Sequence, residues 1–308
     1  MLNALKWTAA AAMLLAMACT GNKTATQGEA AAEDSAVAEV PVADTLVFET
    51  IDFVDSMSYK IKVVDYSGDE EPYPYTIETV TDYCNLSTLE AVAGKPEAVE
   101  FVNQWLTLDA AAEMVEAPVT AEKVAKKYAE LKKQGITDVR SAFKDMSGKR
   151  LAEEDIMPEL GFASANEYEA NVFVNWQAPN VLTLWDGGYE YFAGGAHGMP
   201  WGIGRTFDLK NLRVLTLDDI VAKEGRKAVL KMIVAQLQEE YGDTDMLNAP
   251  DDIDFPGADP SLMKEGVSFD YGAYEIGPYA LGMPGVIISY EKMKPYLTPE
   301  VKELLEME

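Results

Sequence analysis

The chain has 308 residues with 52 acidic and 25 basic side chains, so its formal net charge is −27 at pH 7. The negative electrostatic field of such a protein repels a phosphate backbone, which argues against nucleic acid as a partner. One histidine and two cysteines exclude a zinc site of the Cys and His kind and a multi-disulfide scaffold, so the core must come from packing of the 48% hydrophobic residues.

The first residues have the pattern of an export signal. Lys6 precedes an apolar run, residues 9–18, that is too short to span a bilayer as a helix. Cys19 follows directly after a small residue, which resembles a lipobox, where the cysteine is diacylated before cleavage. We therefore expect residues 1–18 to be a lipoprotein signal peptide and Cys19 to carry the lipid. The alternative is an ordinary signal peptide that is cleaved after Ala18.

The sequence after the signal indicates a tethered protein of the cell envelope. Residues 19–43 contain almost no large apolar side chain and cannot bury enough surface to order themselves, so we expect a disordered tether. No later apolar stretch is long enough for a spanning helix. Membrane attachment is therefore expected through the N-terminal lipid only, in the periplasm or at the outer-membrane or cell surface. Cys84 follows a strand-like run and is expected to be a buried small side chain.

The folded part begins with strands and continues with two helices. Three runs rich in β-branched and aromatic residues are expected to be strands: residues 45–53, 59–66 and 73–84. Residues 96–106 and 121–134 repeat apolar residues at helical spacing. Thr120 is the expected N-cap of the second helix and Gly135 its expected end. Both helices are expected to cover a sheet.

The second half returns to strands. Residues 172–176 and 181–185 are followed by Asp186-Gly187, a dipeptide suited to a type I′ hairpin turn, and then by residues 189–193. This order predicts an antiparallel meander, which a strand at 201–209 continues. Five apolar residues at i, i+3, i+4, i+7 and i+11 predict an amphipathic helix: Leu230, Ile233, Val234, Leu237 and Tyr241. Strands near 266–275 and 284–290 precede a short helix that begins at Thr298. The grouping predicts an α+β fold with mainly antiparallel sheets.

The most distinctive short segment is residues 191–198, Tyr-Phe-Ala-Gly-Gly-Ala-His-Gly. Glycines in such a cluster permit positive φ angles or close backbone approach. One interpretation is a loop that presents His197 and free backbone amides to a ligand. The other is a demanding tight turn in which His197 is packed or hydrogen-bonded. We prefer the second because no other histidine is present to share a metal. We therefore expect His197→Ala to lower stability more than ligand affinity.

The sequence contains only weak signals of a hydrolase active site or a calcium site. No Gly-x-Ser-x-Gly elbow is present, which disfavours a serine hydrolase. Glycoside hydrolysis needs two placed carboxylates, which cannot be singled out among 52 acidic residues. The acidic loop 243–259 invites a calcium interpretation. However, an EF-hand frame that starts at Asp243 has Asn248 where glycine is needed and ends at Asp254 instead of glutamate. A solvated acidic loop is preferred, and calcium binding is left open.

Aromatic residues supply one more candidate, a platform for stacking on sugars. Its members would be Trp185, Tyr189, Tyr191, Trp201, Phe207, Tyr271, Tyr274 and Tyr279. Aromatic residues in strands usually pack in the core or on a sheet face. We therefore expect most of this set to be structural.

Three segments in order resemble the RsiV-type C-terminal domain, a family of bacterial extracytoplasmic domains. They are residues 191–198; residues 206–209 (Thr-Phe-Asp-Leu) with 215–219 (Leu-Thr-Leu-Asp-Asp); and residues 274–282 (Tyr-Glu-Ile-Gly-Pro-Tyr-Ala-Leu-Gly), the most specific of the three. The match covers about residues 191–292. The preceding part is more loosely similar to the module that precedes this domain in RsiV and in the non-catalytic part of the peptidoglycan deacetylase PdaC.

The resemblance divides the folded part into two modules. It implies a PdaC/RsiV-like N-terminal module at 44–190 and an RsiV-type C-terminal domain at 191–308. We expect the two to pack as one body because the meander runs across the join. RsiV-type anti-sigma factors also have a cytoplasmic segment and a spanning helix, and PdaC-type enzymes have a deacetylase domain with metal-binding histidines. We expect neither output module in this chain.

The resemblance also implies a function, because the extracellular part of RsiV recognises lysozyme. The leading hypothesis is a non-enzymatic cell-envelope lipoprotein that binds a cell-wall-related ligand, either peptidoglycan or a cationic protein such as lysozyme. The rival hypothesis is a carboxylate-dependent peptidoglycan or glycan hydrolase or modifying enzyme, and a third is a structural brace. No catalytic residue, cofactor or metal is assigned. The candidate ligand-binding residues are Tyr191, Gly194, Gly195, His197, Gly198, Tyr274, Glu275, Pro278 and Tyr279.

Overall fold

The computed structural model describes most of the chain after residue 43. The described residues are 44–64, 75–108, 112, 114–137, 140–141, 144 and 165–307. Val42–Glu308 form one compact unit. The signal peptide and tether predicted for residues 1–43, including Cys19, lie outside the described residues. Within them, no helix is long and apolar enough to cross a membrane.

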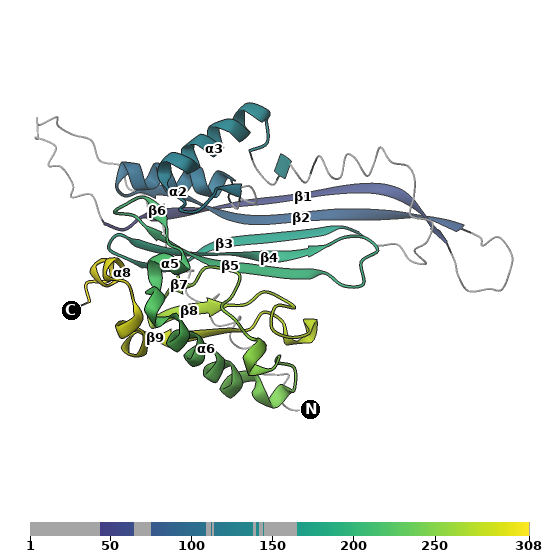
Figure 1. Ribbon diagram of the computed structural model, residues 1–308. Coiled ribbons are helices and arrows are strands. Elements are labelled where there is room, and N and C mark those ends of the chain that lie inside the picture. The colour runs from purple at the N-terminus through teal and green to yellow at the C-terminus, as the bar shows by residue number, and fades with distance from the viewer. Residues whose placement is uncertain are drawn as a thin grey trace, which may run out of the picture. The chain divides into compact units, whose positions relative to one another are not determined.

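The described residues form a central sheet with the strand order β1-β2-β3-β4-β5-β6 (Figure 1). Its strands are β1 (Val47–Val64), β2 (Tyr75–Ala93), β3 (Glu167–Ala178), β4 (Val181–Tyr191), β5 (Met199–Asp208) and β6 (Arg213–Val214). Neighbouring strands are antiparallel except β2 and β3, which run parallel. This arrangement confirms the prediction of an α+β fold with mainly antiparallel pairing.

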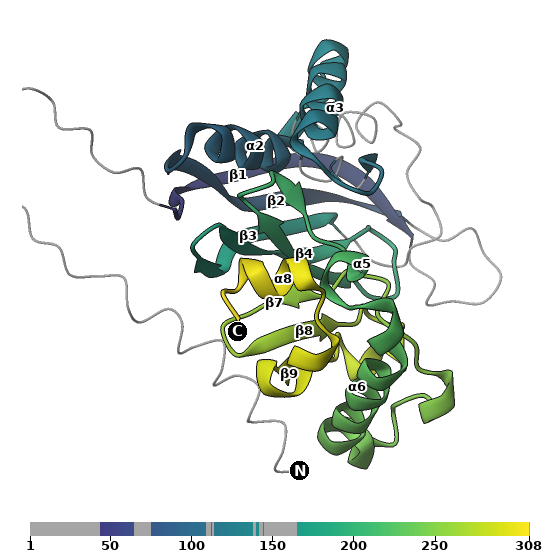
Figure 2. The ribbon, with the colours of Figure 1, turned by 60° about the vertical axis from the view of Figure 1, so that its left-hand side comes forward.

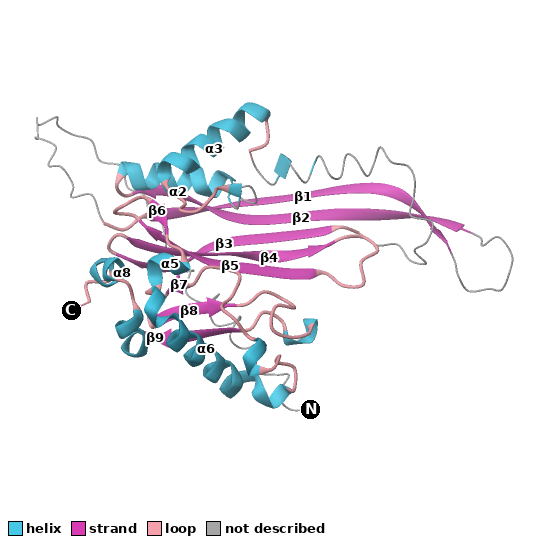
Figure 3. Ribbon diagram, viewed as in Figure 1, coloured by secondary structure: helices cyan, strands magenta, loops and turns pink. Residues whose placement is uncertain are grey.

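A second sheet has the order β7-β8-β9 and is antiparallel throughout. Its strands are β7 (Ser261–Leu262), β8 (Gly266–Asp270) and β9 (Gly285–Ser289). The α-helices are α2 (Pro96–Leu108), α3 (Ala121–Gln134), α5 (Leu217–Ile220), α6 (Arg226–Tyr241), α7 (Tyr290–Met293) and α8 (Pro299–Leu304). Along the chain, groups of strands alternate with groups of helices, as the sequence predicted; Figure 3 shows the helices in cyan and the strands in magenta.

Two helix ends follow the expected end signals. Gly135 has a φ of 78° just after α3, a left-handed conformation that glycine adopts without strain, and its N–H donates to the Lys132 carbonyl. At α8, the Thr298 hydroxyl oxygen accepts a hydrogen bond from the Val301 N–H, as an N-cap does. At α3, Thr120 precedes the helix but makes no side-chain cap bond. The glycine signal at Gly135 and the N-cap signal at Thr298 therefore each predicted a helix end correctly.

β1 and β2 form a longer ribbon than the sequence indicated. Two segments were predicted as separate strands, 45–53 and 59–66, and their parts within Val47–Val64 belong to the single strand β1. Residues 65 and 66 lie outside the described residues. Its register with β2 is continuous from Phe48 opposite Ala91 to Val64 opposite Tyr75. β2 pairs with β3 only over Tyr83–Ser87. The outer part of the ribbon therefore extends past β3–β5 as a two-stranded arm (Figure 1).

The hairpin turn predicted at Asp186-Gly187 is wrong. β4 runs through these residues without a break, and the chain turns before it, at Asn180, which has a φ of 58°. The glycines serve close packing instead. A Cβ on Gly188 would lie 1.8 Å from the Glu169 backbone oxygen in β3. Glycine in a strand interior marks such close approach, which local sequence patterns do not distinguish from a turn.

The two faces of the central sheet bury two hydrophobic clusters. Leu182 and Leu184 of β4 belong to the cluster that contains α2, whereas Val181 belongs to the cluster of α6 and β7–β9. Successive side chains of a strand point to opposite faces, which explains this split. Thr183 points to the second face and donates a hydrogen bond to the Leu262 carbonyl at 2.6 Å. Figure 2 shows α2 and α3 on one side of β1–β4, with α6 and β7–β9 on the other.

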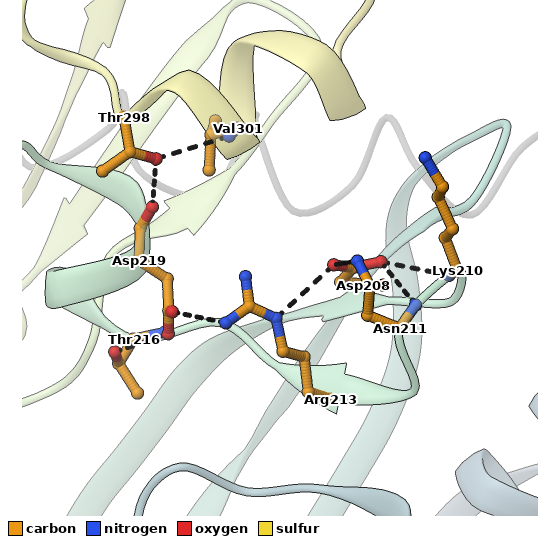
Figure 4. Close-up of polar contacts among 8 residues, drawn as sticks. All are labelled: Asp208, Lys210, Asn211, Arg213, Thr216, Asp219, Thr298 and Val301. Atoms are coloured by element: carbon orange, nitrogen blue, oxygen red, sulfur yellow. Dashed lines mark hydrogen bonds and ion pairs between the residues drawn. The ribbon is translucent and has the colours of Figure 1, made fainter.

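A polar network joins the β5–β6 turn to α5 and α8 (Figure 4). The Arg213 guanidinium contacts the buried Asp208 carboxylate at 3.5 Å and the Asp219 carboxylate at 2.6 Å. Asp219 also accepts a hydrogen bond from the Thr216 N–H at 2.9 Å, and its carbonyl accepts one from the Thr298 hydroxyl. Asp208, Thr216 and Asp219, which belong to the second segment of the resemblance (residues 206–209 with 215–219), therefore have a structural role here.

Candidate functional site

The glycine-rich loop lies between β4 and β5 and is closed by short-range hydrogen bonds. The Tyr191 hydroxyl donates to the Gly195 carbonyl at 3.1 Å, and the Gly195 N–H donates to the Phe192 carbonyl at 2.8 Å. Gly194 has a φ of 87°, which side chains other than glycine rarely adopt. A Cβ on Gly198 would lie 2.1 Å from the Tyr189 ring. The Tyr189 ring can therefore pack against the backbone at residue 198 only because this residue is glycine.

A buried polar network anchors the base of this loop. Asp82 of β2 is 0% exposed. Its carboxylate accepts hydrogen bonds from the Tyr59 hydroxyl at 2.9 Å and from the N–H of Asn166 at 2.7 Å. The Asn166 side-chain oxygen in turn accepts from the Ala193 N–H at 2.8 Å. Sequence reasoning missed this network, although a lone Asp between Val80 and Cys84, in the buried register of a strand, was a usable signal.

The second half of the site is the segment 272–281. Tyr274 has a φ of 70°, and the turn around it is held by Glu275. The two Glu275 carboxylate oxygens accept hydrogen bonds from the backbone N–H of Gly257 at 2.6 Å and of Gly272 at 2.7 Å. The Pro278 carbonyl accepts from the Leu281 N–H. Glu275 and Pro278 were both predicted as ligand-binding residues. Glu275 thus holds the turn that carries Tyr274, and Pro278 closes the turn that carries Tyr279.

The two halves meet at His197. Its ring stacks on the Tyr279 ring with centroids 4.0 Å apart and planes at 28°. Its Nε2 lies 2.8 Å from the Tyr274 hydroxyl and its Nδ1 lies 3.0 Å from the Gly198 carbonyl oxygen. The Tyr279 hydroxyl donates to the same carbonyl at 2.8 Å. We call His197, Tyr274 and Tyr279 the aromatic cluster.

The hydrogen bonds of the aromatic cluster are mutually consistent. In a neutral imidazole one ring nitrogen donates and the other accepts. Here an Nδ1–H donates to the Gly198 carbonyl, and Nε2 accepts from the Tyr274 hydroxyl. Both ring nitrogens are therefore engaged, and the expectation that His197 is packed and hydrogen-bonded agrees with these contacts. Tyr274 remains 51% exposed. The cluster therefore exposes to solvent a tyrosine ring whose position is fixed by its contacts with His197 and Tyr279.

Of the eight candidate aromatic residues, two are buried, one is exposed and the other five are half-buried. Phe207 and Tyr271 are buried core residues at 0% and 2% exposure. Trp185 lies over Gly202, where a Cβ would come within 2.4 Å of its ring. Tyr274 and Tyr279 meet at the surface with ring centroids 5.6 Å apart. The structure therefore brings together the first and third segments of the resemblance and leaves most other aromatic residues as packing.

The acidic loop 243–259 is tied to the fold by its backbone and by single carboxylates. The Asp259 carboxylate accepts from the Leu217 N–H at 2.7 Å, and the Tyr271 hydroxyl donates to the Asp254 carbonyl at 2.7 Å. Burial, followed by the charges of Glu275 and Asp254, raises the pKa of Tyr271 well above its usual value of 10. In the part of the chain that the structure describes, no group of three or more His, Cys, Asp or Glu side chains is arranged to hold a metal ion.

The half-buried carboxyl of Asp270 has a raised pKa. Burial at the end of β8 raises the pKa of Asp270 above its usual 3.8, and a hydrogen bond from the Ser268 hydroxyl, at 3.0 Å to each oxygen, partly opposes this. The carboxyl contacts the backbone closely, because a Cβ on Gly285 would lie 2.5 Å from Asp270 Oδ1. Its surroundings therefore favour the protonated form more than water does.

These features define an α+β protein with a surface aromatic cluster between two loops. No protein-family model matches the chain, and no curated protein matches it significantly. Among solved structures, it is similar to a member of the DUF3298 family from Bacteroides fragilis NCTC 9343, with a TM-score of 0.52, 22% identity, and coverage of 85% of this chain and 99% of that one. A DUF3298 family protein from Pseudomonas aeruginosa PAO1 is 19% identical over 80% of this chain and 96% of that one, with a TM-score of 0.43. The first likeness shows that the chain shares its fold with a domain of unknown function.

Proposed function

We propose that this protein is a non-enzymatic, lipid-anchored protein of the cell envelope that binds a cationic protein such as lysozyme through the aromatic cluster. The observation that carries the proposal is the exposed Tyr274 ring, which His197 and Tyr279 hold in place at the surface. A surface aromatic residue with fixed orientation loses little conformational freedom on binding. Tyrosine is accordingly frequent among the residues that dominate protein interfaces.

The charge of the chain supports a cationic partner. At −27, the protein attracts a positively charged protein at long range, which raises the association rate and makes it dependent on salt. At short range, an arginine guanidinium stacks favourably on a tyrosine face. The acidic residues and the aromatic cluster therefore favour the same kind of partner. The resemblance to the RsiV-type domain supports lysozyme as the first candidate.

The rival hypothesis, a carboxylate-dependent hydrolase, is less well supported by the site. Such an enzyme needs an acid and a base that can exchange protons with the substrate. Glu275 is the carboxylate of the third resemblance segment, and both of its oxygens accept backbone hydrogen bonds. The contacts of His197 are likewise with the cluster and the loop backbone. These contacts stabilise a surface, which favours a binder over a hydrolase.

The test is calorimetric titration of the mature, unlipidated protein with hen egg-white lysozyme at low and physiological ionic strength. Cytochrome c, another small cationic protein, is the control. The proposal predicts saturable binding to lysozyme that weakens with salt but persists at physiological ionic strength, with weaker binding to the control. Equal binding to both proteins that disappears with salt contradicts it, because it indicates attraction of charge alone.

A further inference from the structure

A group of oxygen-bearing side chains lies where the second sheet meets β5 of the central sheet. β7 and β8 both contact β5. Ser261 of β7 pairs directly with Ser268 of β8, and Asp270 follows two residues later on the same face of β8. Gly204 of β5 faces this group, because a Cβ on Gly204 would lie 2.5 Å from Ser261 Oγ and 3.8 Å from Asp270 Oδ2. The Ser261 hydroxyl and the Asp270 carboxylate therefore point to the same part of the interface.

The Ser261 hydroxyl differs from the hydroxyl groups next to it. The hydroxyls of Thr183 and Thr206 lie 3.0 Å apart, and both bond to the backbone of Leu262. Ser261 is only 1% exposed, and its hydroxyl has no hydrogen-bond partner among the described residues. A buried polar group without a partner is uncommon in proteins and indicates a bound water molecule or ion.

The Asp270 carboxylate has no counter-charge. It accepts hydrogen bonds from the Ser268 hydroxyl, at 3.0 Å to each oxygen. In the part of the chain that the structure describes, no Lys, Arg or His side chain forms an ion pair with it. The nearby Tyr241 phenol is neutral at pH 7, because burial raises its pKa above 10. A half-buried carboxylate in these surroundings is stabilised by a cation that neutralises it.

We propose that Asp270, Ser261 and Ser268 bind one monovalent cation, Na⁺, between β5 and the second sheet. Hard cations prefer carboxylate and hydroxyl oxygens as ligands. One carboxylate balances one positive charge, which favours a monovalent over a divalent ion. An ion with ligands at roughly 2.3–2.6 Å, as Ca²⁺ has, can bridge oxygens that are 3.0 Å apart. Na⁺ is about as large as Ca²⁺, whereas K⁺ is larger.

The experiment measures the melting temperature of the mature, unlipidated protein in NaCl, KCl and choline chloride at neutral pH and equal ionic strength. Equal ionic strength keeps the screening of surface charges constant, and choline is too large for the site. An ion that binds only the folded state raises the melting temperature. We expect a value about 3–6 °C higher in NaCl than in choline chloride, as for an ion at about ten times its dissociation constant. KCl should give a smaller increase.

Two variants with matched controls locate the site. Asp270→Asn removes the charge, and Asp251→Asn removes an exposed carboxylate of the acidic loop. Ser261→Ala removes the unpartnered hydroxyl, and Ser87→Ala removes a half-buried hydroxyl from β2. Asp270→Asn should abolish the difference between NaCl and choline chloride, and Ser261→Ala should reduce it by about half because one ligand is lost. Both controls should keep the full difference.

Each outcome supports or contradicts a stated part of the proposal. Equal melting temperatures of the parent protein in all three salts overturn it, and the Ser261 hydroxyl is then assigned to a bound water molecule. A difference between NaCl and choline chloride that persists in Asp270→Asn, or that Ser261→Ala leaves at its full size, contradicts the location. Equal stabilisation by KCl and NaCl contradicts the choice of ion. The site shares no residue with the aromatic cluster, so Na⁺ binding and lysozyme binding can fail independently.

Discussion

Replacement of His197 by alanine is expected to lower the stability of the protein more than it lowers its affinity for a ligand. The substitution removes the stack on Tyr279, at 4.0 Å between centroids, and two hydrogen bonds, to Gly198 and from Tyr274. An aromatic stack contributes about 1 kcal/mol and a net hydrogen bond about 1 kcal/mol. Because the imidazole is exposed and water replaces part of the loss, we expect a net cost of about 2 kcal/mol.

Thermal unfolding measures this cost. For a domain of this size, 1 kcal/mol corresponds to a change in melting temperature of about 2–4 °C, so His197→Ala should lower it by about 4–8 °C. Tyr279→Phe is the matched variant, because it keeps the ring stack and removes only the hydroxyl bond to Gly198. It should lower the melting temperature by about half as much. An unchanged melting temperature for His197→Ala, together with complete loss of lysozyme binding, would refute this reasoning and make His197 a direct contact.

The remaining predictions concern the framework. Gly188→Ala should destabilise by about 3 kcal/mol or more in chemical denaturation, because the new Cβ meets the Glu169 oxygen at 1.8 Å. Arg213→Ala should cost about 2 kcal/mol in the same assay, because it leaves the buried Asp208 carboxylate without its guanidinium. Asp270→Asn should change the way in which the free energy of unfolding depends on pH. A raised folded-state pKa stabilises the protein below about pH 3.8, and this contribution is lost as pH rises through the raised pKa. Relative to the parent protein, the Asp270→Asn variant should therefore be more stable at neutral than at acid pH, and equal profiles for the two proteins would contradict this.

Local signals in the sequence were sufficient for the three long helices α2, α3 and α6 and for the start of α8. The apolar repeat that predicted a helix ending at Tyr241 corresponds to α6. Its predicted members Ile233 and Leu237 are buried, Leu230 and Val234 are half-buried, and Val229, which the repeat did not include, is buried as well. Gly135 and Thr298 end and begin helices for the expected conformational reasons. These signals act within one or two turns of the chain. They can therefore be recognised in the sequence without knowledge of the tertiary structure.

Long-range contacts decided the features that the sequence did not reveal. The Asp186-Gly187 dipeptide lies in mid-strand because β3 and β5 approach it closely, which no local pattern records. Asp82 and Asn166 are 84 residues apart in the chain, and His197 and Tyr274 are 77 apart. The candidate residues of the aromatic cluster could be named individually from composition and resemblance. Their hydrogen bonding and stacking depended on a pairing of distant loops.

The most direct test of the central claim compares two tyrosines of equal exposure. Tyr274 is 51% exposed in the aromatic cluster, and Tyr83 is 53% exposed on β2. The account predicts that Tyr274→Ala weakens lysozyme binding at least tenfold at physiological ionic strength, whereas Tyr83→Ala leaves the dissociation constant unchanged. Equal affinities for both variants and the parent protein would show that the aromatic cluster is not the binding surface.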